Sequence, residues 1–272
     1  MHKTILVTGA TDGIGLVTVK MLAELGHSLI IHGRTPSKVE AVANEIEQAY
    51  KVNVATIVAD LSSLSAVHNM VAELKQRFNS IDVVINNAGV YAVSDTITAD
   101  NLDVRFAVNT VAAYILTKDL LPLIADDGRI VNLSSAAQAS VDLTALKGDK
   151  PLADGQAYAQ SKLALTMFSR SLGLLEQQKG TDKVIVSINP KSLLGSKMVK
   201  TAYGITGGDL SIGADILLRA ALSDEFLSAA GQYFDNDIGA FGSPHPDALN
   251  TVKVEQVVET IESVIAANAA IN

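Results

Sequence analysis

The two residues best suited to chemistry in this sequence are Tyr158 and Lys162, within the segment 158–162 (YAQSK). Residues four positions apart lie on one face of a helix, so both side chains would point into the same space. A nearby ammonium favours the tyrosinate, and the tyrosine could then give a proton to a carbonyl oxygen or take one from an alcohol. Because this spacing also occurs by chance in many helices, the pair needs support from the rest of the chain.

A glycine-rich segment, residues 8–15 (TGATDGIG), lies between the first apolar run and the first helical pattern. Glycines there permit a tight turn and let the backbone approach a pyrophosphate, which the N–H groups and dipole of the following helix would bind. The position between a strand and a helix favours a dinucleotide site over a generic glycine-rich turn. The candidate cofactor-binding residues in it are Gly9, Thr11, Asp12, Gly13, Ile14 and Gly15.

The choice of cofactor depends on Arg34, in the segment 32–35 (HGRT), which follows Gly15 by 19 residues. An acidic residue there would bind the ribose 2′-OH of NAD, whereas an arginine accommodates the 2′-phosphate of NADP. The guanidinium can pair with that phosphate, with Lys38 nearby. We therefore expect NADP(H), with NAD(H) as the alternative. Arg34 could instead be an ordinary solvated surface arginine. The acidic residue Asp12, in the glycine-rich segment, also weighs against NADP.

The elements that must position these residues are short apolar runs that alternate with helical patterns. Continuous apolar runs are typical of parallel strands that are buried on both faces. The expected strands are Ile5–Val7, Leu29–Ile31, Val54–Val58, Val83–Ile85, Ile130–Val131, Val184–Val186 and a last one within 231–235. Helical patterns include a long region at about 100–124 and a closing helix at 252–265. This alternation predicts an α/β fold: one domain, residues 1–272, with a Rossmann-type doubly wound parallel sheet and helices on both faces.

Further motifs follow in a fixed order along these elements. The segment 86–89 (NNAG) ends the fourth expected strand, and the segment 130–135 (IVNLSS) contains the fifth. Together with residues 8–15 and the pair Tyr158 and Lys162, they make the sequence similar to the short-chain dehydrogenase/reductase family. That family has the motifs Thr-Gly-x-x-x-Gly-x-Gly, Asn-Asn-Ala-Gly and Ser…Tyr-x-x-x-Lys.

The resemblance implies roles for particular residues. Ser135 would polarise the substrate oxygen, with Ser134 as the second choice, and Asn109 would belong to a proton relay. The implied catalytic set is Asn109, Ser135, Tyr158 and Lys162. The implied cofactor contacts beyond the glycine-rich segment and Arg34 are Asp60, Leu61, Asn87, Ala88, Gly89, Tyr158, Lys162 and Pro190. From the residues alone, Asp60 could equally cap the next helix, and Asn109 could make a structural hydrogen bond.

Two departures from the family pattern concern the substrate end. Ser135 and Tyr158 are 23 residues apart, a longer gap than usual, which resembles the branch of retinol dehydrogenases and their bacterial relatives. The insertion at 140–156 would border the active site. After Pro190 the family usually has a glycine and then a threonine four residues later. Lys191 and Gly195 stand at these positions, and Ser196 is a candidate substitute for the threonine.

The resemblance implies hydride transfer between NADP(H) and a carbonyl compound or a primary or secondary alcohol. A mobile, apolar lid at about 191–210 favours a hydrophobic substrate, although a packed core helix would give the same pattern. One alternative is a catalytically impaired dinucleotide-binding sensor, which the altered Pro190-Lys191 segment supports. The other is a sugar-nucleotide epimerase or dehydratase, but the 82 residues after Pro190 leave little room for its larger substrate domain.

Composition narrows the remaining possibilities. The formal net charge of −8 argues against a general nucleic-acid binder, which needs a basic face. The chain has no cysteine, which excludes thiolate chemistry, and its five histidines show no ligand spacing, so we expect no metal. No apolar run approaches the ~20 residues needed to span a bilayer. We expect a cytoplasmic protein with a small-molecule substrate, and the resemblance implies a homodimer or homotetramer.

Overall fold

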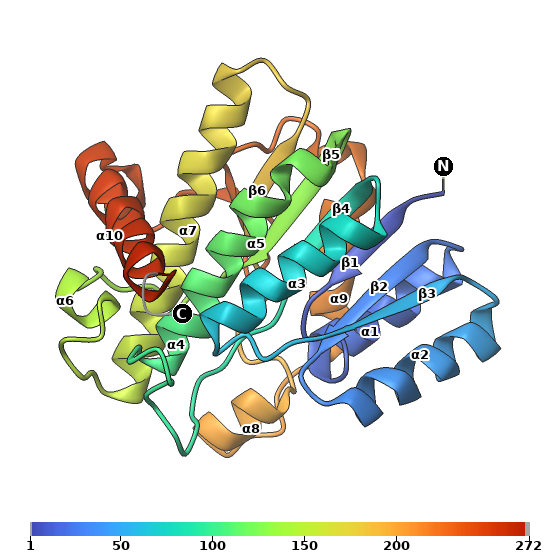
Figure 1. The fold of residues 1–272 in the computed structure, drawn as a ribbon, viewed down its shortest axis with the longest axis horizontal. Coiled ribbons are helices and arrows are strands. Elements are labelled where there is room, and N and C mark those ends of the chain that lie inside the picture. Colours follow the sequence, from blue (N-terminus) through green and yellow to red (C-terminus); the bar gives the residue numbers. More distant parts are fainter. Residues whose placement is uncertain (1, 270–272) are drawn as a thin grey trace.

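One sheet of eight strands, in the order β3-β2-β1-β4-β5-β6-β7-β8, organises the chain. The computed structural model describes residues 2–269 (Figure 1). The strands are β1 Thr4–Val7, β2 Ser28–Gly33, β3 Val54–Val58, β4 Ile81–Asn86, β5 Ile124–Leu133, β6 Val184–Asn189, β7 Tyr233–Asp235 and β8 Ala240–Gly242. All pairings between them are parallel except that of β7 with β8.

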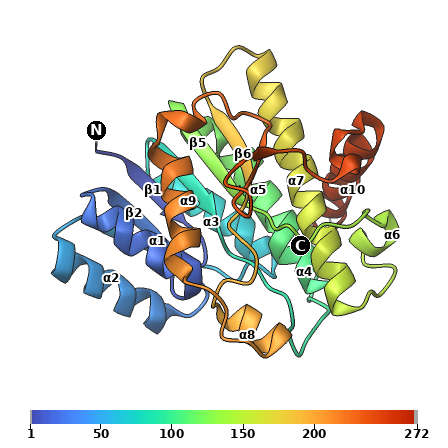
Figure 2. The same ribbon diagram turned by 180° about the vertical axis from the view of Figure 1, so that it is seen from behind.

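Helices cover both faces of this sheet, as Figures 1 and 2 show from opposite sides. One face carries α3, α5 and α7, with α10 packed outside α7, and the other carries α1, α2 and α9. The main helices are α1 Gly13–Glu24, α2 Pro36–Tyr50, α3 Leu64–Arg77, α5 Ala113–Leu120, α7 Asp154–Gln178, α9 Leu210–Leu222 and α10 Thr251–Ala269. Shorter ones are α4 Val104–Phe106, α6 Leu143–Leu146 and α8 Lys197–Tyr203. The predicted doubly wound fold is confirmed.

The apolar strands are buried on both faces because successive side chains point to opposite helical layers. In β1, Leu6 packs in the core under α3, α5 and α7, while Ile5 and Val7 pack in the core under α1, α2 and α9. In β4, Val84 belongs to the first core and Ile85 to the second. Neither face of these strands meets water, which explains their unbroken apolar sequence.

The direction of winding reverses between β1 and β4, which are neighbours in the sheet. From β1 the chain adds β2 and β3 on one side, then returns to add β4, β5 and β6 on the other. In open α/β sheets, such a reversal leaves a crevice outside the carboxyl ends of the strands, where ligands bind. The loops that follow β1, β4, β5 and β6 therefore meet at one place.

Two predicted elements were wrong in their bounds. The helical region at 100–124 begins only at Val104, after the carboxylate of Asp103 caps it by accepting from the Arg105 N–H. It ends near Pro122, and Ile124 already belongs to β5. The segment 231–235 contains the expected strand, β7, but it is not the last one, because a turn after it lets β8 return antiparallel at the sheet edge. Short strands of this kind carry too little pattern to be recognised.

No helix in residues 2–269 combines the length and apolarity required to cross a membrane.

Candidate active site

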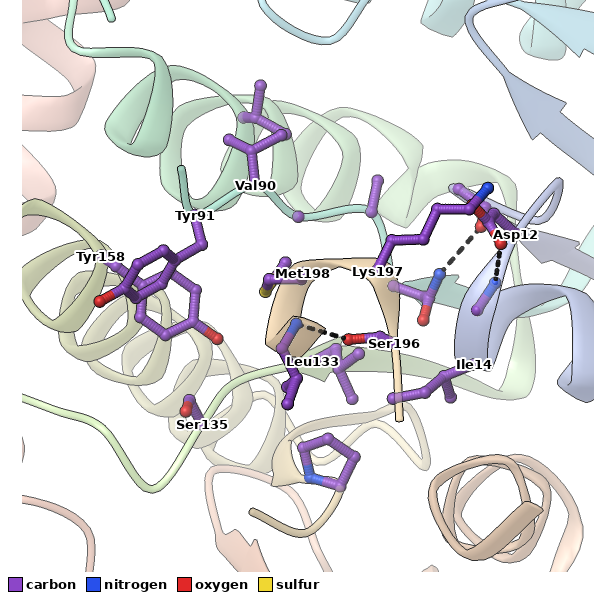
Figure 3. A pocket seen from close by; sticks show the side chains of 18 of the residues that line it. Asp12, Ile14, Val90, Tyr91, Leu133, Ser135, Tyr158, Ser196, Lys197 and Met198 are labelled. Atoms are coloured by element: carbon purple, nitrogen blue, oxygen red, sulfur yellow. Dashed lines mark hydrogen bonds and ion pairs between the residues drawn. The ribbon is translucent and has the colours of Figure 1, made fainter. Parts of the chain in front are cut away.

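A cavity of about 590 Å³ opens at the carboxyl ends of the strands, between the glycine-rich segment and α8 (Figure 3). Most of the residues predicted from the sequence line it. They are Gly9, Thr11, Asp12, Gly13, Ile14, Arg34, Asp60, Leu61, Asn87, Ala88, Gly89, Ser135, Tyr158, Lys162 and Pro190. Gly15 and Asn109 are not part of the lining. The predicted residues thus gather at one cavity, with Gly15 and Asn109 outside its lining.

The glycine-rich segment is locked against β4 by close backbone contacts. Gly9 has a φ of +64°, and a Cβ there would lie 2.9 Å from the Cα of Ala88. A Cβ at Gly15 would lie 2.4 Å from the Gly9 carbonyl oxygen, so Gly15 permits α1 to pack tightly without touching the cavity. The Asn87 side chain donates to the Thr8 carbonyl at 2.8 Å. Only glycine fits at positions 9 and 15.

The space above the start of α1 fits a phosphate-containing group. Gly13 begins this helix, and the nearest atom to a Cβ built there is the Ser196 Cβ at 4.0 Å, so the cradle is open. The first N–H groups of a helix and its dipole favour an anion. The Asp12 carboxylate accepts from the Gly13 N–H at 2.8 Å and so takes up one of these donors.

His32 supports the glycine-rich segment from below, a role that the sequence did not suggest. It is buried at the end of β2, and its Nδ1 accepts from the Gly9 N–H at 3.3 Å. Its Nε2 is 3.1 Å from the Ala59 carbonyl, which fixes Nε2 as the protonated nitrogen. Burial lowers the pKa of His32 to about 4, so the ring is neutral at pH 7. A buried histidine of this kind has no sequence signature.

Arg34 and Asp60 lie at the rim of the cavity, at the ends of β2 and β3. Arg34 is exposed and forms no ion pair within 4.0 Å among the described residues. Burial would raise the pKa of Asp60, but hydrogen bonds from Ser62 and the charge of Arg34 lower it below 3.8. Asp60 accepts from the Ser62 N–H at 2.9 Å and from the Ser62 hydroxyl at 2.7 Å, so its local role is to fix the turn before α3.

Tyr158 and Lys162 lie on the same face of α7 and both line the cavity. Lys162 is 3% exposed, its Nζ donates to the Leu133 carbonyl at 2.6 Å, and the same atom is 5.8 Å from the centre of the Tyr158 ring. Burial lowers the pKa of Lys162 to about 8. The ring of Tyr91 packs at 4.9 Å, centre to centre, on that of Tyr158 (Figure 3).

The two serines after β5 differ in their surroundings. Ser134 is 2% exposed, and its hydroxyl shares a 2.6 Å hydrogen bond with Thr166. Ser135 is partly exposed, and Figure 3 shows its side chain on the cavity wall near Tyr158. Its carbonyl accepts from Tyr233 at 3.3 Å, which holds the backbone in place. Ser135 is therefore the better placed to meet a ligand.

Asn109 lies behind the cavity wall, in a π-helical turn at Ala107–Ala112. Such turns are rare and are frequent at functional sites. The side chain of Asn109 donates to the Val90 carbonyl at 3.0 Å and accepts from the Val90 N–H at 2.8 Å. It also donates to the Ser161 hydroxyl at 3.0 Å. The amide thus fixes the loop after β4 to the helix that carries Tyr158.

The segment after β6, whose sequence departs from the family pattern, also has an unusual backbone conformation. Lys191 has a φ of +114°, in the region that favours glycine, and it lines the cavity. A Cβ at Gly195 would lie 2.8 Å from the Gly208 and Thr206 carbonyl oxygens, so a threonine does not fit there. Ser196 lines the cavity, but its hydroxyl caps α8 by accepting from the Val199 N–H at 3.2 Å.

Two contacts fix α8 and its flanking loops beside the cavity. The Gly195 N–H donates to the Gly208 carbonyl at 2.7 Å, which joins the two ends of the segment. The Lys197 ammonium lies 2.6 Å from the Asp12 carboxylate, so α8 is tied to the glycine-rich segment (Figure 3). Burial would raise the pKa of Asp12, but its hydrogen bond with Lys197 contributes to lowering it. Lys197 belongs to none of the sequence motifs, and it was not among the predicted site residues.

The insertion at 140–156 was expected to border the active site. None of its residues is part of the cavity lining, but a Cβ built at Gly155 would lie 3.2 Å from the hydroxyl of Tyr91, which does line the cavity. The helix α6 of the insertion packs against α10, and a Cβ at Gly148 would overlap the Asn101 carbonyl at 2.1 Å. This part of the insertion is thus held between the loop before α4 and the closing helix α10 rather than over the cavity. No group of three or more His, Asp or Glu side chains within residues 2–269 could hold a metal ion.

Comparisons with known proteins agree with this geometry. The family described as short chain dehydrogenase matches residues 3–203. Human polyprenol dehydrogenase is 30% identical over 86% of this chain and 77% of its own length. Human retinol dehydrogenase 13 is 29% identical over 86% of this chain and 76% of its own. These relatives agree with the branch indicated by the spacing of Ser135 and Tyr158.

Solved structures share the fold. An uncharacterized protein from Mycobacterium paratuberculosis superimposes with a TM-score of 0.80, 26% identity, and coverage of 97% of this chain and 93% of that one. A structure from Escherichia coli CFT073, described as a short chain dehydrogenase complexed with NADPH, gives a TM-score of 0.69 and 26% identity. It covers 86% of this chain and 96% of its own.

Proposed function

The chain belongs to the short-chain dehydrogenase family, and from this premise we propose that it is an NADP(H)-dependent oxidoreductase. It would reduce an apolar aldehyde or ketone, or oxidise the corresponding alcohol. One observation carries the proposal: Tyr158, Lys162 and Ser135 line the same cavity as the glycine-rich segment and Arg34. The acid–base group and the dinucleotide cradle therefore share one space.

Support for NADP(H) over NAD(H) comes from the adenosine end of the cavity. Arg34 is exposed on the lining, where a guanidinium could pair with a 2′-phosphate. No acidic side chain replaces it at the end of β2. Asp12, the acidic residue that weighs against NADP, is neutralised in part by Lys197. A related structure in complex with NADPH adds to this support.

The proposed chemistry divides between the cofactor and the chain. The bound dinucleotide supplies or accepts a hydride. Tyr158 would hold the proton that a carbonyl oxygen takes up, or accept the proton that an alcohol loses. Ser135 would hold the same oxygen by a hydrogen bond. Lys162 would favour the tyrosinate through its positive charge, and Asn109 would position the loop and helix around them.

The substrate end of the cavity supports an apolar substrate. Apolar and aromatic side chains from two loops and α8 line it, namely Val90, Tyr91, Val93, Leu193, Met198 and Val199. Binding pockets of this kind select ligands by apolar contact, with a few polar groups to orient them. The relatives named for retinol and polyprenol carry apolar alcohols in their names, which points in the same direction.

Three further properties stay predictions. We propose that residues 1–272 form one domain, with 191–210 as a lid over the substrate. The homodimer or homotetramer and the cytoplasmic location rest on the family resemblance and the sequence alone. A sensor without activity remains the second candidate, and the strained Lys191 is the observation that favours it.

The proposal is tested by measuring NADPH and NADH oxidation with aliphatic and polyene aldehydes and ketones of increasing length. We expect turnover with NADPH to exceed that with NADH, and apolar substrates to exceed small polar ones. Binding of NADPH without turnover of any substrate in the series, or with the matching alcohols and NADP, would favour the sensor.

A further inference from the structure

A strained stretch of chain lines the cavity directly after β6. Lys191 and Leu193 are both non-glycine residues with positive φ, at +114° and +55°. Such conformations cost free energy and persist only where the surrounding structure holds them. The backbone N–H of Lys191 has a long contact of 3.4 Å to the Asn189 side chain, so Lys191 has little local support.

The support comes from Asp237, in the turn between β7 and β8. Its carboxylate accepts from the Ser192 N–H at 3.0 Å and from the Ser192 hydroxyl at 2.6 Å. It also accepts from the side chain of the buried Asn189 at 2.8 Å. One carboxylate therefore holds Asn189, two residues before Lys191, and Ser192, directly after it.

The rest of the same turn reinforces this attachment. The Asn236 N–H donates to the Asn189 carbonyl at 3.1 Å, and its side chain donates to the Pro190 carbonyl at 3.0 Å. Asp235 accepts from the Asn189 side chain at 2.7 Å. Lys191 thus lies between two residues, Pro190 and Ser192, that are fixed from outside the loop.

We propose that Asp237 is a positioning residue for the cofactor: it holds Ser192 so that Lys191 keeps its left-handed conformation and the wall 190–193 keeps its shape. The proposal rests on the proposed function. It assigns Asp237 to the end of the cavity beside Ser135, because the Ser134 N–H donates to the Ile188 carbonyl at 2.7 Å and so joins the end of β6 to the end of β5. Pro190 to Leu193 line the cavity, while the turn itself does not. The adenosine end, with Arg34, would not depend on Asp237.

The test combines Asp237→Ala and Lys191→Gly, singly and together, with Asp182→Ala as a charge-matched control at the opposite end of β6. Dissociation constants are measured for NADPH and for adenosine 2′,5′-bisphosphate, which lacks the nicotinamide half. Melting temperatures are measured for the same proteins. We expect Asp237→Ala to weaken NADPH binding about fivefold, the effect of roughly one hydrogen bond, and to leave the bisphosphate within twofold. Asp182→Ala should change neither.

Glycine tolerates positive φ, so Lys191→Gly should remove the need for the clamp. In that background, Asp237→Ala should weaken NADPH binding less than twofold and lower the melting temperature less than in the wild type. Equal weakening of both ligands, unchanged NADPH binding, or a loss of equal size in the glycine background would overturn the proposal. If the wild-type protein binds neither ligand, the proposed NADP(H)-dependent function is wrong. The thermal coupling between Asp237 and Lys191 would then still be seen, and its absence would refute the clamp itself.

Discussion

The Nζ atom of Lys162 lies 5.8 Å from the centre of the Tyr158 ring and is directed to the Leu133 carbonyl. The ammonium thus joins the end of β5 to the helix that carries the tyrosine, in a position that water barely reaches. Burial of this cation has a cost in stability, as is common where activity requires a destabilised site.

Replacement of Lys162 by methionine should therefore stabilise the protein while it removes activity. The folded-state pKa of about 8 lies below the ordinary 10.5, so the folded state binds the proton less tightly than the unfolded chain does. Stability from this group is gained as the pH rises from about 8 to about 10.5, and at pH 7 the buried charge costs roughly 3 kcal/mol. The substitution also removes the hydrogen bond to Leu133, so we expect the free energy of unfolding to rise by a net amount of about 1 kcal/mol. Urea unfolding measures it, and a less stable variant would refute the argument.

His32 should make stability depend on pH in the acidic range. Its folded-state pKa of about 4 lies below the ordinary 6.5, so the unfolded chain takes up the proton first as the pH falls. The neutral His32 ring therefore contributes fully to the free energy of unfolding above about pH 6.5, and this contribution is lost towards pH 4. Its full size is about 3 kcal/mol. The free energy of unfolding should fall less over this range in His32→Gln than in the wild type. Identical pH profiles would show that the ring does not titrate as described.

Arg34→Ala should shift the cofactor preference. Loss of a charge-assisted contact to the 2′-phosphate should weaken NADPH binding about 10- to 100-fold, while NADH binding changes less than threefold. Arg77→Ala is the matched control, because Arg77 is also partly exposed but pairs with Glu73 on α3, outside the cavity. Comparable turnover with NADH that Arg34→Ala leaves unchanged would contradict the assignment.

Arg105 should be essential to stability. It is 1% exposed and bridges the carboxylates of Asp103 and Asp154, each at 2.7 Å. Arg105→Met leaves the buried Asp103 without its cation and should cost about 3–5 kcal/mol. Asp154→Ala removes a half-exposed partner at the start of α7 and should cost at most about 1 kcal/mol. Urea denaturation of both variants measures the difference, and equal losses would contradict it.

The fold and the centre of the site could be predicted because their signals are local. Unbroken apolar strands, the glycine-rich segment and the Tyr158–Lys162 spacing each express a short-range requirement of backbone or helix geometry. The sequence marked Lys191 as unusual, since a lysine stands where the family has a glycine, but its positive φ is a finding of the structure.

What could not be predicted depends on contacts between distant parts of the chain. His32 meets Gly9 and Ala59 only when β1, β2 and β3 are assembled. The π-helical turn at Asn109 reflects packing against Ser161 and Val90, and no propensity of its own residues indicates it. The packing of α6, within the insertion at 140–156, against α10 is likewise a contact between distant parts of the chain that no local pattern indicates.

The most direct test of the central claim uses NADPH that carries deuterium on the hydride-donating carbon, an apolar aldehyde, and Tyr158→Phe beside Tyr50→Phe. Tyr50 ends α2 outside the cavity and serves as the matched control. We expect the wild type and Tyr50→Phe to place deuterium on the alcohol carbon of the product, as mass spectrometry would detect. Tyr158→Phe should lower this rate about a thousandfold with little change in NADPH affinity. Product without deuterium, or an undiminished rate in Tyr158→Phe, would contradict the proposed function.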